Sequence, residues 1–172
     1  MADIPGWRVE RVPITHPDAA LLVDEVQAEY VQRYGGPDET PIEPTYFDDP
    51  MGAFFVGYLH DVPVVTGAWR RRTDVEVDGT WKTAEIKRMY VAPGARRIGL
   101  ARAMLAHLEE TARAAGAEAM VLETGLRQPE AITLYESAGY TPIPGFGYYK
   151  DAHLSRCFAR SLVVKAQGTS SS

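Results

Sequence analysis

The chain has 172 residues, of which 45% are hydrophobic and 24% charged, an ordinary composition for a soluble globular domain. Its net charge of −5 argues against nucleic-acid binding by bulk electrostatics, and its single cysteine excludes an internal disulfide. No apolar run approaches the ~20 residues that cross a bilayer and the first residues lack a signal-peptide pattern, so we expect a cytoplasmic protein that binds neither nucleic acid nor membrane.

The first third of the chain predicts a strand, a helix and a long loop. Residues 7–14 alternate apolar and polar side chains, which favours a half-buried strand. Apolar residues then recur at helical spacing from Pro17 until Gly35 ends the pattern. Residues 37–52 contain four prolines, which predicts a loop with at most a short turn of helix.

The rest of the chain changes from a hairpin pattern to alternating helices and strands. Residues 53–59 and 62–71 predict a β-hairpin, which residues 81–91 extend to three strands. The remaining predicted elements are a helix at 97–115, a strand at 119–123, a helix at 129–138, and strands at 140–143 and 155–164. This order predicts a mixed α/β fold with helices flanking the sheet, in one domain over residues 1–166 with a disordered tail at 167–172.

A basic turn with a glycine, Arg96 to Ala101, lies between the long predicted strand and the main predicted helix. Backbone N–H groups at a helix start have no partner inside the helix, and the helix dipole adds partial positive charge there. Gly99 would let the main chain approach a phosphate closely, and Arg96 and Arg97 would add permanent charge. The turn therefore predicts an anion site, although both arginines could also belong to a merely solvated helix start.

Two motifs resemble those of the GNAT N-acetyltransferase superfamily. Residues 96–101 resemble its acetyl-coenzyme A signature, (Arg/Gln)-x-x-Gly-x-(Gly/Ala), and the preceding residues 85–86 and 89–91 match its central strand. Residues 131–140 resemble the family's A-x-x-L-Y-x-x-x-G-(Phe/Tyr) pattern. The resemblance covers residues 53–165 and implies the GNAT fold, a mixed but mostly antiparallel sheet that splays at an acetyl-CoA cleft.

The same resemblance implies acetyl-CoA as a co-substrate. Pantetheine would lie along the central strand, and the pyrophosphate would bind the amides of the basic turn. The residues that the resemblance places at the coenzyme are Met89, Tyr90, Val91, Arg96, Arg97, Ile98, Gly99, Leu100, Ala101, Gln128 and Ala131. At Gln128 the family often has asparagine, but glutamine offers the same kind of amide contact. The four histidines share no spacing that would indicate a metal site, so we expect none.

Acetyl transfer to an amine needs a base, because an alkyl amine with a pKa near ~10 is mostly protonated at neutral pH. Glu85 is the expected base, at the position of the strand glutamate that serves in the family's histone-acetylating branch. Strand alternation puts it on the same face as Lys87 and Met89 unless a bulge intervenes. A surface pair of Glu85 with Lys87 is the alternative, and whether Glu85 would act directly or through water stays open.

An acid near the sulfur helps to expel coenzyme A. Tyr135 lies at the family's tyrosine position, and a phenol is protonated at pH 7, so it can donate a proton to the leaving thiolate. The alternative is a tyrosine that only packs against the coenzyme. No cysteine or serine is placed for an acyl-enzyme, which favours direct attack in a ternary complex.

The acceptor side carries weaker signals. Residues 37–49 hold five acidic and no basic side chains, which would attract a cationic amine if this loop roofs the pocket, or would simply be solvated. Glu123, at a strand end, and the aromatic residues Tyr148 and Tyr149 are candidates for substrate binding. Each of them could equally be an ordinary strand-end or packing residue.

Together these features favour an N-acetyltransferase that acts on the primary amine of a small cationic molecule. The alternatives are a protein lysine or N-terminal acetyltransferase, and a sensor that binds acyl-CoA without turnover. The sequence leaves open the acceptor, the acyl-chain preference and the oligomeric state, although exposed edge strands in this fold commonly pair and make a homodimer possible.

Overall fold

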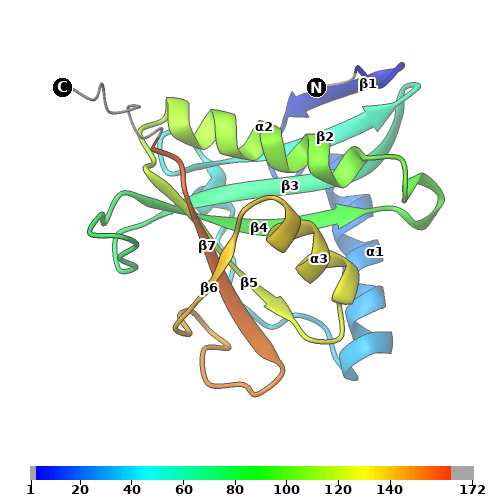
Figure 1. Cartoon of the computed structure of the whole chain (residues 1–172). Helices are drawn as coiled ribbons and strands as arrows, with labels where there is room; N and C mark the ends of the chain where they lie inside the picture. Colours follow the sequence, from blue (N-terminus) through cyan, green and yellow to red (C-terminus); the bar gives the residue numbers. More distant parts are fainter. Residues whose placement is uncertain (1–2, 164–172) are drawn as a thin grey trace.

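The computed structural model describes residues 3–163. Its elements in chain order are β1 (Trp7–Arg11), α1 (Pro17–Tyr34), η1 (Pro44–Phe47), β2 (Gly52–Leu59), β3 (Val62–Arg72), β4 (Thr83–Val91), η2 (Pro93–Ala95), α2 (Leu100–Ala114), β5 (Ala119–Gly125), α3 (Pro129–Ser137), β6 (Thr141–Ile143) and β7 (Ser155–Ser161). The strands form one seven-stranded sheet in the order β1-β2-β3-β4-β5-β7-β6 (Figure 1). The predicted hairpin, its third strand and the two later helices are therefore present.

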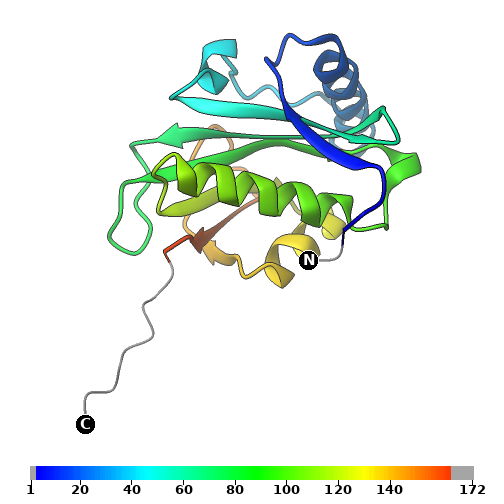
Figure 2. The ribbon, with the colours of Figure 1, turned by 90° about the horizontal axis from the view of Figure 1, so that it is seen from above.

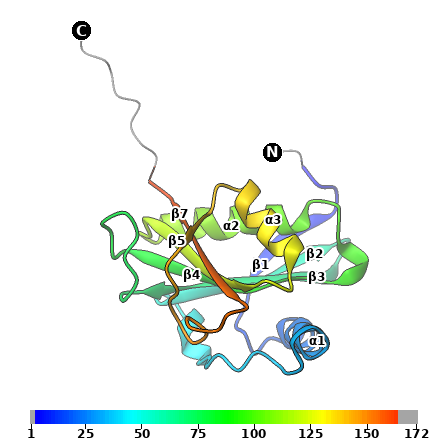
Figure 3. The same ribbon diagram turned by 60° about the horizontal axis from the view of Figure 1, so that its bottom comes forward.

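Helices cover both faces of the sheet. Helix α1 lies on one face, and α2 and α3 lie on the other (Figures 2 and 3). On α2 the apolar residues Leu100, Met104 and Leu108 recur one turn apart and are fully buried against the sheet. On α1, Ala19, Leu22 and Val26 do the same in a separate core cluster on the opposite face. This three-layer packing fixes the middle strands between two cores.

The sheet is mixed, as predicted, and its one parallel pair is the irregular one. All neighbouring strands run antiparallel except β4 and β5. These two pair only from Thr83 to Glu85 on β4 and from Ala119 to Val121 on β5. Beyond Glu85 and Val121 the strands separate, so the sheet splays in its middle.

The predicted helix at 97–115 begins three residues late, at Leu100. The backbone has a positive φ of 69° at Arg97 and of 90° at Gly99, and a right-handed helix does not accommodate such angles. Glycine adopts the left-handed region without a steric cost, which suits Gly99 to the residue before the helix. The three residues before Leu100 therefore form a tight turn.

Two predicted strands are shorter in the structure. The strand predicted at 7–14 stops before Pro13, which has no amide hydrogen to donate to a neighbouring strand. The strand predicted at 155–164 stops at Ser161, while Val164 and the predicted tail at 167–172 lie outside the described residues. Among the helices of residues 3–163, none is both long and apolar enough to cross a membrane.

Candidate active site

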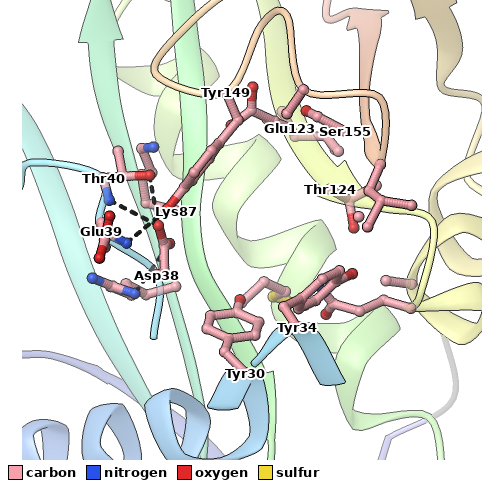
Figure 4. A pocket seen from close by; sticks show the side chains of 18 of the residues that line it. Tyr30, Tyr34, Asp38, Glu39, Thr40, Lys87, Glu123, Thr124, Tyr149 and Ser155 are labelled. Atoms are coloured by element: carbon pink, nitrogen blue, oxygen red, sulfur yellow. Dashed lines mark hydrogen bonds and ion pairs between the residues drawn. The ribbon is translucent and has the colours of Figure 1, made fainter. Parts of the chain in front are cut away.

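A cavity of about 490 Å³ opens where β4 and β5 separate. Four consecutive residues of each strand line it, Ile86–Met89 on β4 and Leu122–Gly125 on β5. Successive residues of a strand point to opposite faces, so a lining of consecutive residues means that the cavity passes through the sheet. The end of α1, the start of α3 and the loops that follow α1 and precede β7 complete the walls (Figure 4).

A β-bulge interrupts β4 at the cavity. Lys87 pairs with Ala68 of β3 whereas Tyr90 pairs with Thr66, so two residues of β4, Arg88 and Met89, oppose one residue of β3. Arg88 has a positive φ of 53°, and its carbonyl accepts a hydrogen bond of 2.6 Å from the Thr66 hydroxyl. The bulge ends the regular alternation of faces after Lys87.

On the α3 side the cavity meets four of the residues expected at the coenzyme or in catalysis: Met89, Gln128, Ala131 and Tyr135. Tyr135 is 5% exposed, and burial raises the pKa of its phenol well above the ordinary value. Within residues 3–163 its hydroxyl has no hydrogen-bond partner, so it can donate to a group in the cavity. Gln128 reaches across the gap, where its amide donates to the Tyr34 hydroxyl at 3.4 Å.

Most backbone amides of the predicted anion turn are unengaged. The Arg96 amide donates to the Pro93 carbonyl at 3.5 Å, and the next amide to donate is that of Ala103, to the Gly99 carbonyl at 3.1 Å. Among the described residues, the amides of residues 97–102 have no acceptor. The Arg96 side chain is engaged with the Val91 carbonyl at 2.9 Å and the Glu29 carboxylate at 2.7 Å. The candidate anion site therefore offers main-chain donors, while the Arg96 side chain has partners within the protein.

Glu85 does not occupy the half-buried cleft position that the sequence suggests. It is 1% exposed and lies outside the lining of the cavity. Its carboxylate contacts Arg70 at 3.1 Å, Arg72 at 3.0 Å and Lys87 at 3.1 Å. The expected pair with Lys87 thus exists, but it is buried within a larger ionic cluster. A carboxylate that neutralises three cations inside the sheet is poorly placed to take a proton from an acceptor.

Glu123 is a carboxylate of β5 that lines the cavity. It lies two residues beyond Val121, where the pairing with β4 ends (Figure 4). Burial raises the pKa of its carboxyl, and the nearby Ser155 hydroxyl and Lys87 ammonium oppose this effect. A half-buried carboxylate with a raised pKa is a stronger base than an exposed one.

Only the first part of the acidic loop reaches the cavity. Asp38 and Glu39 line it, whereas the remaining acidic residues of segment 37–49 do not. The Asp38 carboxylate accepts hydrogen bonds from the Thr40 amide at 2.9 Å and the Thr40 hydroxyl at 2.6 Å, and it contacts Arg88 at 3.4 Å (Figure 4). The expected acidic roof is therefore small, and its principal charge is already paired.

Of the two tyrosines expected on the acceptor side, only one lines the cavity. Tyr149 lines the cavity, and its hydroxyl accepts a hydrogen bond of 2.7 Å from the Glu39 amide. Tyr148 is 55% exposed and only packs edge-on against Tyr149. Tyr90, expected at the coenzyme, points its side chain into the core under α1, where its hydroxyl donates to Glu25 at 3.2 Å.

Several lining residues were not singled out from the sequence. They include two tyrosines of α1, two neighbouring residues of β4 and one residue of β7, namely Tyr30, Tyr34, Lys87, Arg88 and Ser155. The α1 tyrosines follow the spacing of a buried helix face, so the pattern indicated core packing for them. The residues on β4 depend on the bulge, which has no sequence signal here.

Within residues 3–163, no group of three or more histidine, cysteine, aspartate or glutamate side chains could hold a metal ion. Cys157 is buried on β7, and burial raises the pKa of its thiol, which disfavours the nucleophilic thiolate.

The chain matches the model of the acetyltransferase (GNAT) family over residues 21–140. It is 40% identical over 88 residues to an IAA acetyltransferase from Azospirillum brasilense, a match that covers 51% of this chain and 58% of that relative. The match therefore spans little more than half of the curated relative's length.

Two solved structures resemble the chain over nearly their whole length. A Klebsiella pneumoniae structure assigned as an acyl-CoA N-acyltransferase has a TM-score of 0.72 at 24% identity, covering 91% of this chain and 98% of that one. YncA from Salmonella typhimurium, solved with its cofactor acetyl-CoA, has a TM-score of 0.66 at 18% identity, covering 94% and 96%. At these identities the likeness establishes a shared fold.

Proposed function

Because this chain belongs to the GNAT family of acetyltransferases, we propose that it transfers the acetyl group of acetyl-CoA to the primary amine of a small molecule. The observation that carries the proposal is the cavity through the splayed sheet, which brings Tyr135 and Glu123 to one space. The Tyr135 hydroxyl can donate a proton to the leaving sulfur, and the Glu123 carboxylate can take a proton from the amine, as acetyl transfer requires.

The coenzyme is proposed to enter along β4. The edge of β4 that faces the gap has no ladder partner on β5 beyond Glu85, so its main-chain groups are available to pantetheine as to an added strand. The unengaged amides of residues 97–102 would hold the pyrophosphate, since they combine free N–H donors with the positive end of α2. Gln128 and Ala131 would border the pantetheine arm at the start of α3.

The proposed reaction is a direct transfer in a ternary complex. The Glu123 carboxylate takes a proton from the acceptor ammonium, and the neutral amine nitrogen then attacks the thioester carbonyl carbon. The carbon–sulfur bond breaks, and the sulfur takes a proton from the Tyr135 hydroxyl as coenzyme A leaves. The second proton lost by the nitrogen restores the Tyr135 hydroxyl, and Glu123 releases its proton to solvent. Glu123 replaces Glu85 as the proposed base because it faces the cavity, whereas Glu85 is enclosed by three cations.

Glu85 is proposed to act as a positioning residue. It holds Lys87 at 3.1 Å, and Lys87 lines the cavity opposite β5. The Lys87 ammonium favours the charged form of Glu123, so Glu85 would influence the base through Lys87.

A small acceptor is favoured over a protein by the way in which the cavity is bordered. The loop after α1 and the loop before β7 meet through the hydrogen bond of 2.7 Å from the Glu39 amide to the Tyr149 hydroxyl. This contact joins segments 110 residues apart across the acceptor side. An extended peptide would need an open groove there. The acceptor amine itself is cationic before it reacts, and the Glu39 and Glu123 carboxylates offer it charge complementarity.

The test is release of free thiol from acetyl-CoA with polyamines, amino acids, aminoglycosides and lysine peptides. Release with a small amine supports the proposal, and release with peptides alone would assign the chain to protein modification. Binding of acetyl-CoA without thiol release in the presence of any acceptor would favour a sensor.

A homodimer through an edge strand, β1 or β6, and a cytoplasmic location both stay predictions.

A further inference from the structure

Two buried polar side-chain atoms lack a hydrogen-bond partner among the described residues, and both belong to residues that line the cavity. They are the Nε of Arg88 and the Oγ of Ser155. A buried donor without a partner costs about 1–3 kcal/mol, so such groups are rare and each calls for an explanation. A ligand that enters the cavity and supplies an acceptor to Arg88 is one such explanation.

The Arg88 side chain is held in place from several directions. It is only 8% exposed, and one of its terminal nitrogens contacts the Asp38 carboxylate at 3.4 Å. Asp38 is itself fixed by Thr40, and its backbone amide and carbonyl both bond to the side-chain amide of Gln27, at 2.8 and 3.3 Å. The positive φ of Arg88, at the bulge of β4, is a conformation that non-glycine residues adopt rarely.

The charge beside this arginine is only partly balanced. Its contact with Asp38 is long for an ion pair and engages one nitrogen, so the Nε edge of the guanidinium remains for another acceptor. Lys87 adds a second cation to the cavity wall, and Glu85 is its ion-pair partner. The planar guanidinium can donate two parallel hydrogen bonds to the two oxygens of a carboxylate.

Cations and a carboxylate line opposite sides of the splay. Beyond Glu85 and Val121 the two strands no longer pair, and the cavity lies between Lys87 and Arg88 of β4 and Glu123 and Thr124 of β5. Ser155 lies on the β5 side, because it pairs with Gly125 at the end of that strand. The β5 side thus offers a carboxylate to an ammonium group, and the β4 side offers an arginine to an anionic group.

We propose that the acceptor is a free amino acid, whose ammonium group faces Glu123 and whose carboxylate binds Arg88. This inference rests on the proposed function and narrows its acceptor. A polyamine would leave the Arg88 Nε without an acceptor and bring further positive charge beside it, which disfavours a polyamine. Asp38 acts as a positioning residue that orients the guanidinium.

The test compares acceptors that differ only in the carboxylate. Leucine and 3-methylbutylamine form one pair, phenylalanine and 2-phenylethylamine another, and each amino-acid amide serves as a neutral control. The readouts are kcat/KM for thiol release from acetyl-CoA, and calorimetric binding of the amino acid to the protein saturated with coenzyme A. We expect the better amino acid to exceed its matched amine and amide by about 10²-fold in kcat/KM, as for a lost charge-assisted pair of hydrogen bonds.

Variants of Arg88 test recognition of the acceptor carboxylate separately from folding of the protein. Arg88→Lys keeps the charge but loses the guanidinium, so it should lower the ratio of kcat/KM for the amino acid to kcat/KM for the matched amine by about 10-fold or more. Arg113→Lys, at an exposed position on α2, is the matched control and should leave this ratio unchanged. Thermal unfolding of each variant shows that the fold is kept.

The outcomes distinguish the inference from the proposed function. Equal rates with amino acids and matched amines would overturn the inference and leave the proposed function standing. An Arg88→Lys variant that folds and lowers kcat/KM equally for the amino acid and the matched amine would also overturn the inference and leave the proposed function standing. No thiol release from any acceptor, with acetyl-CoA bound, would overturn the proposed function, and absence of amino-acid binding in calorimetry would then overturn the inference as well.

Discussion

On the coenzyme side of the gap between β4 and β5, the polar groups are mainly backbone amides, whereas on the acceptor side they are side chains. The amides of residues 97–102 belong to one short turn and need no particular side chain. The acceptor side combines groups of α1, β4, β5, β7 and two loops. Binding by backbone tolerates sequence change, whereas binding by side chains is specific and can change with single residues. We therefore propose that one side binds the common coenzyme, while the other selects the acceptor.

The largest effect is expected on the acceptor side, from Glu123→Gln. The amide is nearly isosteric but cannot take a proton, so kcat/KM should fall by about 10³-fold while the acetyl-CoA Kd stays unchanged. Steady-state thiol release and calorimetry measure the two quantities. Glu110→Gln, at an exposed site on α2, is the control. Unaltered turnover in Glu123→Gln would remove Glu123 from the mechanism.

The pH profile gives an independent test of the same residue. Glu123 must be deprotonated to act, and burial raises its pKa, so kcat/KM should be lost as the pH falls through a value above the ordinary ~4.3 of glutamate. Lys87, Glu85 and Asp38 are the charged groups that influence this titration. The acidic limb should be absent from whatever activity Glu123→Gln retains. An identical limb in both proteins would assign it to another group.

Glu85→Gln should act on stability, because this carboxylate neutralises three cations within the sheet. Removing one partner from a buried ionic cluster leaves its cations uncompensated, and the free energy of unfolding should fall by about 3 kcal/mol. Urea denaturation measures the loss, with the exposed Glu110→Gln as the comparison. A variant that keeps its stability but loses all turnover would restore Glu85 as the base.

Tyr135→Phe tests the side chain that is proposed to protonate the leaving thiolate on the coenzyme side. Without the hydroxyl the thiolate must leave unprotonated, so kcat should fall by about 10²-fold with little change in acetyl-CoA affinity. Tyr46→Phe, outside the cavity lining, is the matched control. If kcat in Tyr135→Phe equals that of the wild type, Tyr135 only packs against the coenzyme.

The smallest effect is expected at the backbone anion site, from Gly99→Asp. The new carboxylate would lie among the unengaged amides and repel the pyrophosphate, so the Kd for acetyl-CoA should rise by about 10-fold. Gly116→Asp introduces the same side chain at a similar positive φ, 99°, beyond the other end of α2 and controls for strain. Equal affinities in both variants would mean that the anion site lies elsewhere.

The sequence predicted the parts of the molecule that depend on local pattern. Helix and strand periodicity, the turn around Gly99 and the motif that carries Tyr135 led to the GNAT fold, which the structure and the family match both confirm. Each of these features depends on a few consecutive residues, so it can be predicted from the local sequence.

What it did not predict depends on contacts between distant segments. Glu85 is enclosed by Arg70 and Arg72 of β3, and the bulge that places Arg88 in the wall arises from the register between β3 and β4. The contact between Glu39 and Tyr149 joins two segments that lie 110 residues apart in the sequence. Alternation along β4 alone therefore could not identify which carboxylate faces the cavity.

The most direct test of the account is thiol release from acetyl-CoA by the wild-type protein and by Glu123→Gln, with free amino acids, matched amines and lysine peptides as acceptors. We predict release with a small amine-bearing acceptor, and its loss in Glu123→Gln although acetyl-CoA still binds. Release with peptides alone, or equal release by both proteins, would contradict an acetyl-transfer site for small amines in the gap between β4 and β5.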